Sequence, residues 1–228
     1  MSARTITSLT NPTVKAVRAL HMRKERDATG HFLAEGLKFI GEALDQQRAP
    51  RLLLVGEDAR PHPILDRARA ATRAAGGEVV VVTHAILEKI SRRDNPQTVL
   101  GVFDQVYTPL SAIQPATAPA WVALEQVRDP GNLGTIIRTA ASLQVDFLVA
   151  GRQGVWPFSR RVLRTSMGSV LKIPVVQTDD VDTTALQFRA AGFELVATVL
   201  DEQAEDLAEL VPHPRRVLLL GNEDAGLA

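Results

Sequence analysis

Two short stretches of this chain combine polar side chains and glycines in patterns that could bind a ligand. In the first stretch, Asn132 and Arg138 lie six residues apart, which is nearly two turns of an α-helix. In the second stretch, Glu223 lies between Gly221 and Gly226. Asn132 and Arg138 could face the same ligand, although a capped helix with one solvated arginine would show the same pattern.

Each stretch directly follows an apolar segment that reads as a short buried strand. The first segment is Ala120–Leu124 and the second is Val217–Leu220. Turn residues follow the first segment, and Asn132 is the expected N-cap of the helix after it. In open α/β sheets, ligands bind outside the carboxyl ends of the strands. We expect the two strands to lie side by side in one parallel sheet, with their loops open at the same edge.

Together, the two motifs resemble the SpoU (TrmH-like) family of RNA 2′-O-ribose methyltransferases, which belongs to the SPOUT superfamily. The first family motif matches Asn132-Leu-Gly-Thr-Ile-Ile-Arg138, and the second matches Leu220-Gly-Asn-Glu-Asp-Ala-Gly226. The resemblance implies a SPOUT α/β domain with a parallel sheet and a C-terminal trefoil knot. The family's third motif, an Ile-Pro pair followed by Ser-Leu-Asn, does not occur before Ala228. We therefore expect the knot-type fold to be incomplete at the C-terminus, in a truncated or a degenerate member of the family.

The resemblance also implies an activity, which is methyl transfer from S-adenosylmethionine to a ribose 2′-hydroxyl of rRNA or tRNA. It assigns catalysis to Arg138, Asn132 and Glu223. Because a guanidinium group stays protonated in proteins, we expect Arg138 to orient the hydroxyl and stabilise the developing alkoxide. Asn132 would position Arg138 or the ribose, and Glu223 would help to position the residues of the first motif.

The cofactor is expected to lie in a crevice between strand ends. By resemblance, Thr198 and Leu200 form one wall of this crevice, and Gly221 and Asn222 form another. Gly221 suits this task because a residue without a side chain lets a cofactor approach the backbone closely.

The net charge is zero, but basic side chains gather in two runs. Positions 4–26 hold six basic residues and one acid, and positions 152–172 hold five basic residues and no acid. Lys and Arg contacts to phosphates dominate affinity for RNA, so these runs are candidate RNA-binding surfaces, although each could also be a solvated helix face. The predicted RNA-binding residues in the two runs are Arg18, Arg23, Lys24, Arg160, Arg161 and Arg164.

The stretch Phe32–Lys38 resembles the substrate-binding domain that precedes the methyltransferase domain in many of these enzymes. That domain is a small α/β/α sandwich similar to certain RNA-binding ribosomal proteins, and the resemblance places Glu35 near its RNA-facing side. Alternating strand and helix patterns in the first half agree with a sheet covered by helices. We predict an RNA substrate-binding domain over 1–103, a proline-containing linker over 104–119, and the methyltransferase domain over 120–228.

Local signals also predict where individual helices begin. Asn11-Pro12 is an N-cap followed by proline at the first helical position, which predicts a helix over about 12–25. Pro157 is expected to start a basic helix that contains Arg160, Arg161 and Arg164.

Several classes of site are not expected. The chain has no cysteine, and its five histidines are scattered without ligand spacing, so we expect no metal site. No apolar run approaches the ~18 residues of a membrane helix, and the N-terminus lacks a signal-peptide core, which favours a cytoplasmic protein. By resemblance, we expect a homodimer when the chain is full length. Two alternatives stay open: a non-catalytic RNA-binding protein and an unrelated α/β enzyme acting on a small metabolite.

Overall fold

The computed structural model describes residues 4–113, 120–211 and 213–227. The chain divides into two compact units, Met1–Gln105 and Val106–Ala228, each with its own five-stranded sheet.

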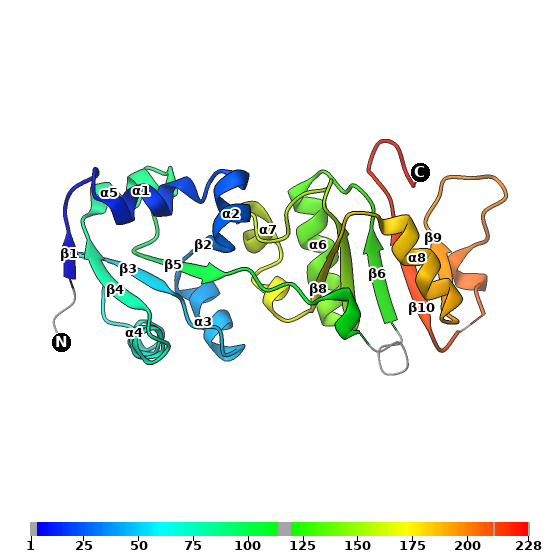
Figure 1. Ribbon diagram of the computed structural model, residues 1–228, viewed down its shortest axis with the longest axis horizontal. Coiled ribbons are helices and arrows are strands. Elements are labelled where there is room, and N and C mark those ends of the chain that lie inside the picture. The colour runs from blue at the N-terminus through cyan, green and yellow to red at the C-terminus, as the bar shows by residue number, and fades with distance from the viewer. Residues whose placement is uncertain (1–3, 114–119, 212, 228) are drawn as a thin grey trace. The chain divides into compact units, whose positions relative to one another are not determined.

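The first unit is a sheet with helices on both faces, as the sequence predicted. Its strands are β1 (Arg4–Ile6), β2 (His31–Glu35), β3 (Leu52–Gly56), β4 (Glu78–Val82) and β5 (Val99–Asp104). They lie in the order β1-β4-β3-β5-β2, in which β5 runs antiparallel to both of its neighbours. The helices are α1 (Pro12–Ala19), α2 (Arg23–Thr29), α3 (Leu37–Asp45), α4 (Pro63–Ala74) and α5 (His84–Ser91). Helices α1 and α5 cover one face, and α3 and α4 cover the other (Figure 1).

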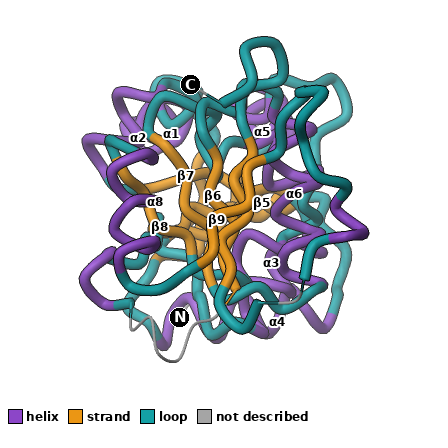
Figure 2. The backbone as a smooth tube through the Cα atoms, turned by 90° about the vertical axis from the view of Figure 1, so that its right-hand side faces the viewer, coloured by secondary structure: helices purple, strands orange, loops and turns teal. Residues whose placement is uncertain are grey.

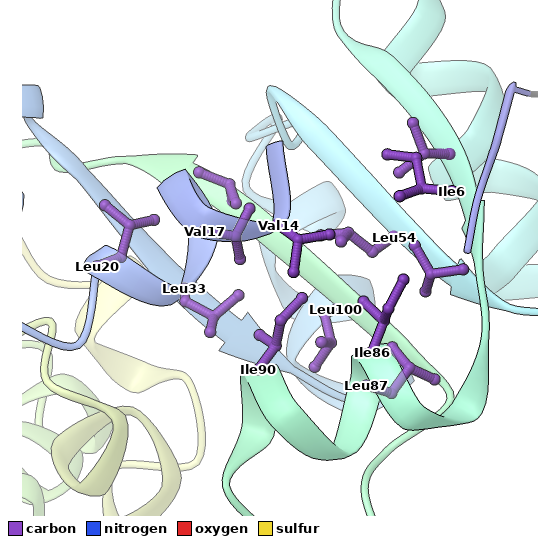
Figure 3. Close-up of a cluster of buried hydrophobic side chains, with 13 residues drawn as sticks. Ile6, Val14, Val17, Leu20, Leu33, Leu54, Ile86, Leu87, Ile90 and Leu100 are labelled. Atoms are coloured by element: carbon purple, nitrogen blue, oxygen red, sulfur yellow. The ribbon is translucent and has the colours of Figure 1, made fainter. Parts of the chain in front are cut away.

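One apolar cluster fixes α1 and α5 on their face of this sheet (Figure 3). Val14 and Val17 of α1 point toward Ile90 of α5, with Leu54 and Leu100 of the sheet beneath them. All five side chains are nearly inaccessible to solvent. Residues three or four apart share a helix face, so the apolar spacing in α1 and α5 determines which face is buried.

The helix predicted over 12–25 is in fact two helices. Asn11 is the N-cap as predicted, since its side chain accepts a hydrogen bond from the Thr13 amide at 2.9 Å. However, α1 ends at Ala19, and Met22 adopts an extended conformation before α2 begins. Arg26 Nη1 donates to the carbonyl oxygens of Leu20 and His21 at 3.0 and 2.8 Å. These bonds satisfy two carbonyl groups at the break between the two helices.

The second unit contains a fully parallel sheet in the order β8-β7-β6-β10-β9. Its strands are β6 (Ala120–Leu124), β7 (Phe147–Gly151), β8 (Val175–Thr178), β9 (Glu194–Ala197) and β10 (Arg216–Leu220), drawn in orange in Figure 2. Its helices are α6 (Pro130–Ser142), α7 (Arg160–Thr165) and α8 (Val181–Ala190). Short 3₁₀ turns lie at Leu110–Ala112, Ser169–Leu171 and Leu207–Glu209. The predicted pairing of the two motif-bearing strands is confirmed, since Leu220 of β10 lies opposite Leu124 of β6.

Aromatic side chains form much of the second core. The Trp121 ring lies 4.2 Å from the ring of Phe188 and 4.7 Å from that of Phe147, measured between centroids. Phe188 belongs to α8, so this contact holds α8 against the central strand β6. Such aromatic pairs add directional contacts to the burial of apolar area.

The basic helix starts three residues later than predicted. Pro157 and Phe158 are buried before the helix, and Ser159 is the N-cap of α7, where its hydroxyl accepts from the Val162 amide. The Phe158 ring packs on Tyr107 and Trp156 at 5.3 and 5.6 Å. This packing keeps the chain in a turn through Phe158, so the hydroxyl cap marks the helix start rather than the proline.

The stretch predicted as a linker has structure at both ends of its described part. Asp104 ends β5, whereas the Thr108 amide donates to Val175 O at 2.8 Å and Ile113 is buried in the second core. Residues 114–119 lie outside the described part of the chain. Across the described residues, no helix is long and apolar enough to cross a membrane.

Candidate active site

The candidate site lies at the carboxyl ends of three neighbouring parallel strands. Strand β10 pairs with β6 on one side and with β9 on the other. The loops that follow these strands, 125–129, 221–226 and 198–200, therefore emerge at the same edge of the sheet. This is the position where open α/β sheets bind ligands, and it brings both sequence motifs together.

The N-cap of α6 is Asp129 rather than Asn132. The Asp129 carboxylate accepts hydrogen bonds from the amides of Gly131 and Asn132 at 2.6 and 2.9 Å, and Pro130 occupies the first turn. An aspartate followed by proline is a strong helix start, because proline is pre-organised for the helix and donates no amide hydrogen bond. Asn132 thus lies inside the first turn, with its side chain free to project from the helix.

Glu223 ties the second motif to the first. Its carboxylate accepts hydrogen bonds from the Arg128 and Asp129 amides at 2.9 and 3.0 Å, and from Asn132 Nδ2 at 3.1 Å. Burial alone would raise the pKa of Glu223, but these hydrogen bonds favour the ionised form and lower the pKa from 4.5 to about 2. Glu223 is therefore a carboxylate at neutral pH and orients the Asn132 amide.

The loop after β10 folds back on itself around Asn222. Backbone hydrogen bonds of 2.8 and 2.9 Å join Asn222 and Gly226 in both directions. The Asn222 side chain accepts from the amides of Asp224 and Ala225 and donates to Gln126 O at 2.8 Å. Asn222 is buried, so its side chain shapes the loop, and the residue offers a ligand mainly its backbone.

The fold requires a glycine at position 221 for a reason other than the predicted close approach of a cofactor. A Cβ atom at this position would lie 2.2 Å from the Gly226 carbonyl carbon and 2.4 Å from the Leu227 nitrogen. Backbone atoms cannot move aside as a flexible side chain can. Gly221 is therefore needed so that the 222–226 loop can fold back across the strand end.

A pocket of about 810 Å³ lies between these loops. Its polar edge comes from Asn132, Thr135 and the 221–226 loop. Apolar side chains from α6, from β10 and from the segments that follow β6, β9 and β10 complete it, namely Val127, Ile136, Val199, Leu200, Leu220 and Leu227. Thr198 also lines it and donates through its hydroxyl to Leu219 O at 3.1 Å. Apolar walls with a few backbone and amide groups suit an adenosyl ligand, so the residues present fit S-adenosylmethionine. All four predicted cofactor residues line the pocket.

Arg138 lies beside this pocket and does not line it. It is exposed on α6, three residues after Thr135, which is about one helical turn. The structure thus brings Asn132 and Glu223 into direct contact and places Arg138 farther along the same helix. Such a position leaves the guanidinium group available to a second ligand bound next to the pocket.

Helix α7 is held close to α6. Thr165 Oγ1 donates to Pro130 O at 3.1 Å, and Arg161 Nη2 lies 3.7 Å from Asp129 Oδ2. A Cβ atom at Gly134 would lie 1.8 Å from Thr165 Oγ1, so the two helices approach through a position without a side chain. Of the predicted RNA-binding residues on α7, Arg161 and Arg164 are exposed and Arg160 is half-buried.

The RNA-binding residues predicted in the first unit have mixed surroundings. Arg18 of α1 is half-buried, Lys24 of α2 is exposed, and Arg23 pairs with Asp27 at 3.4 Å. The Glu35 side chain is only 9% exposed and lies 3.8 Å from Arg93 Nη1. Burial leaves little of this carboxylate for direct contact with RNA.

Sequence reasoning missed three contributors to the site. Asp129 was assigned to a turn, although the Asp-Pro pair itself signals a helix N-cap. Thr135 and Ile136, which line the pocket, follow Asn132 on the same helix and could be inferred from helical spacing once the pocket was known. No group of three or more potential metal ligands occurs among the described residues.

Comparisons with known proteins agree with this arrangement. Residues 11–101 match the MRM3-like substrate binding domain, and residues 119–228 match the SpoU rRNA Methylase family. An uncharacterized tRNA/rRNA methyltransferase from Synechocystis is 32% identical, over 98% of this chain and 80% of that protein. The Bacillus subtilis 23S rRNA (guanosine(2553)-2′-O)-methyltransferase RlmP is 30% identical, over 97% of this chain and 84% of its own length. The crystal structure of an AdoMet-bound rRNA methyltransferase from Sinorhizobium meliloti superposes with a TM-score of 0.88 and 42% identity, covering 99% of this chain and 84% of that one.

Proposed function

Because this chain belongs to the SpoU rRNA methylase family, we propose that it transfers a methyl group from S-adenosylmethionine to a ribose 2′-hydroxyl of rRNA. The observation that carries the proposal is the contact between Glu223 and Asn132, because it joins the two family motifs beside a pocket of suitable size. Relatives named as rRNA methyltransferases favour rRNA over tRNA as the substrate class.

We assign the adenosyl group to the pocket between the ends of β6, β9 and β10. Thr198, Leu200, Gly221 and Asn222 would hold it, mostly through apolar surface and backbone groups. When bound, the cofactor supplies an electrophilic methyl group on a positively charged sulfur. The enzyme's task is then to bring a ribose oxygen in line with that methyl group, which is mainly a matter of positioning.

Arg138 is the residue that we assign to the ribose. Its guanidinium group would hold the hydroxyl and the neighbouring phosphate, and it would stabilise the negative charge that develops on the oxygen as the proton leaves. The exposed position of Arg138 one turn beyond the pocket supports this role, because RNA must approach from solvent.

Asn132 and Glu223 are assigned to orientation. Glu223 holds the Asn132 amide nitrogen, so the Asn132 carbonyl oxygen has a defined direction. It also holds the two amides that precede α6, which fixes the start of the helix that carries Arg138. A rigid catalytic helix reduces the loss of entropy when the reacting groups are aligned.

The proposal includes the division of labour between the units. Residues 1–103 would bind the RNA substrate, and residues 120–228 would bind the cofactor and perform the transfer, with Arg160, Arg161 and Arg164 contacting phosphates near the site. Formation of a homodimer and a cytoplasmic location remain predictions.

Arg138→Ala tests the assignment. We expect methyl transfer to an unmodified large-subunit rRNA transcript to fall by about 10²-fold or more, the effect typical of losing one such stabilising group. Cofactor affinity, measured by calorimetry, should stay within about twofold because Arg138 does not line the pocket. Arg138→Lys should not restore transfer, since a point charge cannot reproduce the planar donor fork.

Arg189→Ala on α8 is the matched control, because it removes an exposed arginine from a helix away from the pocket-lining residues. It should leave transfer unchanged. Near-normal turnover of Arg138→Ala would contradict the catalytic assignment. A wild-type protein that binds the transcript, but neither binds the cofactor nor transfers a methyl group, would instead support the non-catalytic RNA-binding alternative.

A further inference from the structure

Two basic segments about seventy positions apart meet on one surface of the first unit. His21 Nε2 and the Ile90 carbonyl oxygen are 2.6 Å apart, which joins the end of α1 to the end of α5. Leu20 and Ile90 belong to the same buried cluster (Figure 3). Arg23 and Lys24 lie two and three residues after His21, and Arg92 and Arg93 lie two and three residues after Ile90.

This proximity gathers four basic residues, Arg23, Lys24, Arg92 and Arg93, which we call the α2–α5 basic surface. Three residues span at most about 10 Å, so the α-carbons of Arg23 and Lys24 lie within that distance of the His21 α-carbon. Those of Arg92 and Arg93 lie within the same distance of the Ile90 α-carbon. All four side chains are exposed. Arg92 and Arg93 directly follow α5, and only the fold brings this segment to the one that carries Arg23 and Lys24.

Glu35 holds one side chain of this surface, the guanidinium group of Arg93. Its side chain is 9% exposed, and its Oε2 lies 3.8 Å from Nη1 of Arg93, whose side chain is 40% exposed. A carboxylate under the surface restrains one side of the guanidinium group and leaves the other side open to solvent. An arginine restrained in this way loses less conformational entropy when it binds an anion.

The acids nearby neutralise this surface only in part. Asp27 pairs with Arg23 at 3.4 Å, and Glu88 lies 3.5 Å from His84 Nε2. Within the described part of the chain, Lys24 and Arg92 have no acidic partner, and Asp94 is exposed beside Arg93. The four basic side chains still outnumber the acids Asp27, Glu35 and Asp94. Three arginines and one lysine suit a ligand with several phosphates.

We propose that the α2–α5 basic surface binds phosphates of the RNA substrate and that Glu35 is a positioning residue that acts through Arg93. This inference rests on the proposed function, since it names part of the surface that holds the RNA to be methylated. It assigns RNA contact to Arg92 and Arg93, which the sequence did not single out, and gives the buried Glu35 a role without direct contact to RNA.

Arg93→Gln is the first test, with the full chain and an unmodified in vitro transcript of large-subunit rRNA as the probe. We expect affinity to fall about tenfold, as for the loss of one charge-assisted hydrogen bond. The slope of log K against log salt should decrease by about 1, because one phosphate contact is lost. Arg93→Lys should keep the slope, and cofactor affinity should stay unchanged in both variants.

Glu35→Gln gives the sharper test because two models predict opposite changes in RNA affinity. Removal of a negative charge from an RNA-facing surface should strengthen binding by simple electrostatics. If Glu35 positions Arg93, binding should instead weaken by about twofold to fivefold, the range of a partly exposed ion pair, with the salt slope unchanged. The double variant with Arg93→Gln should bind no more weakly than Arg93→Gln alone.

Arg73→Gln on α4 is the matched control, since it removes an exposed basic charge from the opposite face of the same sheet. It should alter neither affinity nor slope, and circular dichroism should show all variants folded. Wild-type affinity and slope in Arg93→Gln would overturn the inference while leaving the proposed function intact. If the wild-type protein methylated none of the RNAs tested, the proposed function would be overturned. The binding results would still test separately whether the basic surface contacts RNA.

Discussion

At the scale of single residues, the site depends on a carboxylate surrounded by donors. Glu223 accepts from two backbone amides and one side-chain amide, all on the segment that starts α6. Because each bond favours the ionised form, Glu223 should stay charged throughout the pH range in which the enzyme works. Glu223 therefore suits an orienting role better than a proton-transfer role.

A pH series with Glu223→Gln tests this role. The pKa of Glu223 is lowered in the folded state from 4.5 to about 2, so its ionised form contributes stability that is fully present above about pH 5. This contribution should shrink as the pH falls below 4.5 and vanish near pH 2. The difference in the free energy of unfolding between wild type and Glu223→Gln, from urea titrations followed by tryptophan fluorescence, should show that decline.

Glu202→Gln is the control for this series, because Glu202 is an exposed acid in the same unit. Its difference from the wild type should stay close to zero at every pH. A Glu223→Gln difference that remains constant from pH 7 to pH 3 would contradict the importance of these hydrogen bonds.

At the scale of elements, the contact between α6 and α7 determines where the phosphate-binding arginines lie. Gly134 belongs to the first motif, and the absence of its side chain lets Thr165 approach α6 and donate to Pro130 O. Arg161 and Arg164 lie on α7, so their distance from Arg138 depends on this contact. The glycine in the motif thus has a packing reason in addition to any role near the cofactor.

Gly134→Ala should separate the two helices. The new Cβ would lie 1.8 Å from Thr165 Oγ1 and 3.0 Å from the Ser166 nitrogen, so overpacking should destabilise the second unit by about 1–3 kcal/mol. This cost should exceed the gain of about 1 kcal/mol from replacing glycine by alanine within a helix. Denaturant unfolding measures the sum, and RNA affinity should fall as well because the arginines move.

Gly41→Ala in α3 is the matched helical control. Its Cβ would meet the flexible end of Ile64 at 3.2 Å, so the change should be close to neutral. Thr165→Ala should recover part of the stability of Gly134→Ala because it removes the closest atom. No recovery in the double variant would show that the contact with Thr165 is not the source of the strain.

At the scale of the whole molecule, each unit has its own core. The first core is aliphatic around α1 and α5, and the second contains Trp121 with Phe188 and Phe193. Both tryptophans of the chain, Trp121 and Trp156, are in the second unit. Tryptophan fluorescence therefore reports on the unit with the cofactor pocket and not on the first unit.

S-adenosylmethionine should therefore stabilise one unit selectively. At 100 times its Kd, a ligand that binds only the folded form adds about 2.7 kcal/mol. For a unit of this size, we expect the midpoint followed by tryptophan fluorescence to rise by roughly 10 °C. Far-ultraviolet circular dichroism reports on the helices and strands of both units. The part of its transition that belongs to the first unit should keep its midpoint. Equal shifts in both signals would show that the units unfold together, and no shift in either would contradict the assigned pocket.

Much of the architecture could be predicted because its causes are local. Apolar runs of strand length followed by turn residues predicted β6 and β10. Because ligands bind outside the carboxyl ends of parallel strands, the polar residues after both strands predicted that their loops share an edge. The resemblance of the two motifs then identified Asn132, Arg138, Gly221 and Glu223. Errors such as the helix over 12–25 arose where a side-chain hydrogen bond competed with continuation of the helix, as Arg26 does when it donates to the carbonyl oxygens of Leu20 and His21.

Spacing and side-chain type act over a few residues, so they suffice to predict the class of fold, the paired strands and the two motifs. Which atoms meet depends on how distant parts of the chain pack. Glu223 reaches Asn132 across 91 positions, Thr165 reaches Pro130 across 35, and His21 reaches Ile90 across 69. Gly221 likewise owes its constraint to the loop that folds back upon it, and Glu35 owes its burial to the strands and the Arg93 loop around it. Such contacts depend on how whole elements pack, and no local pattern specifies that packing.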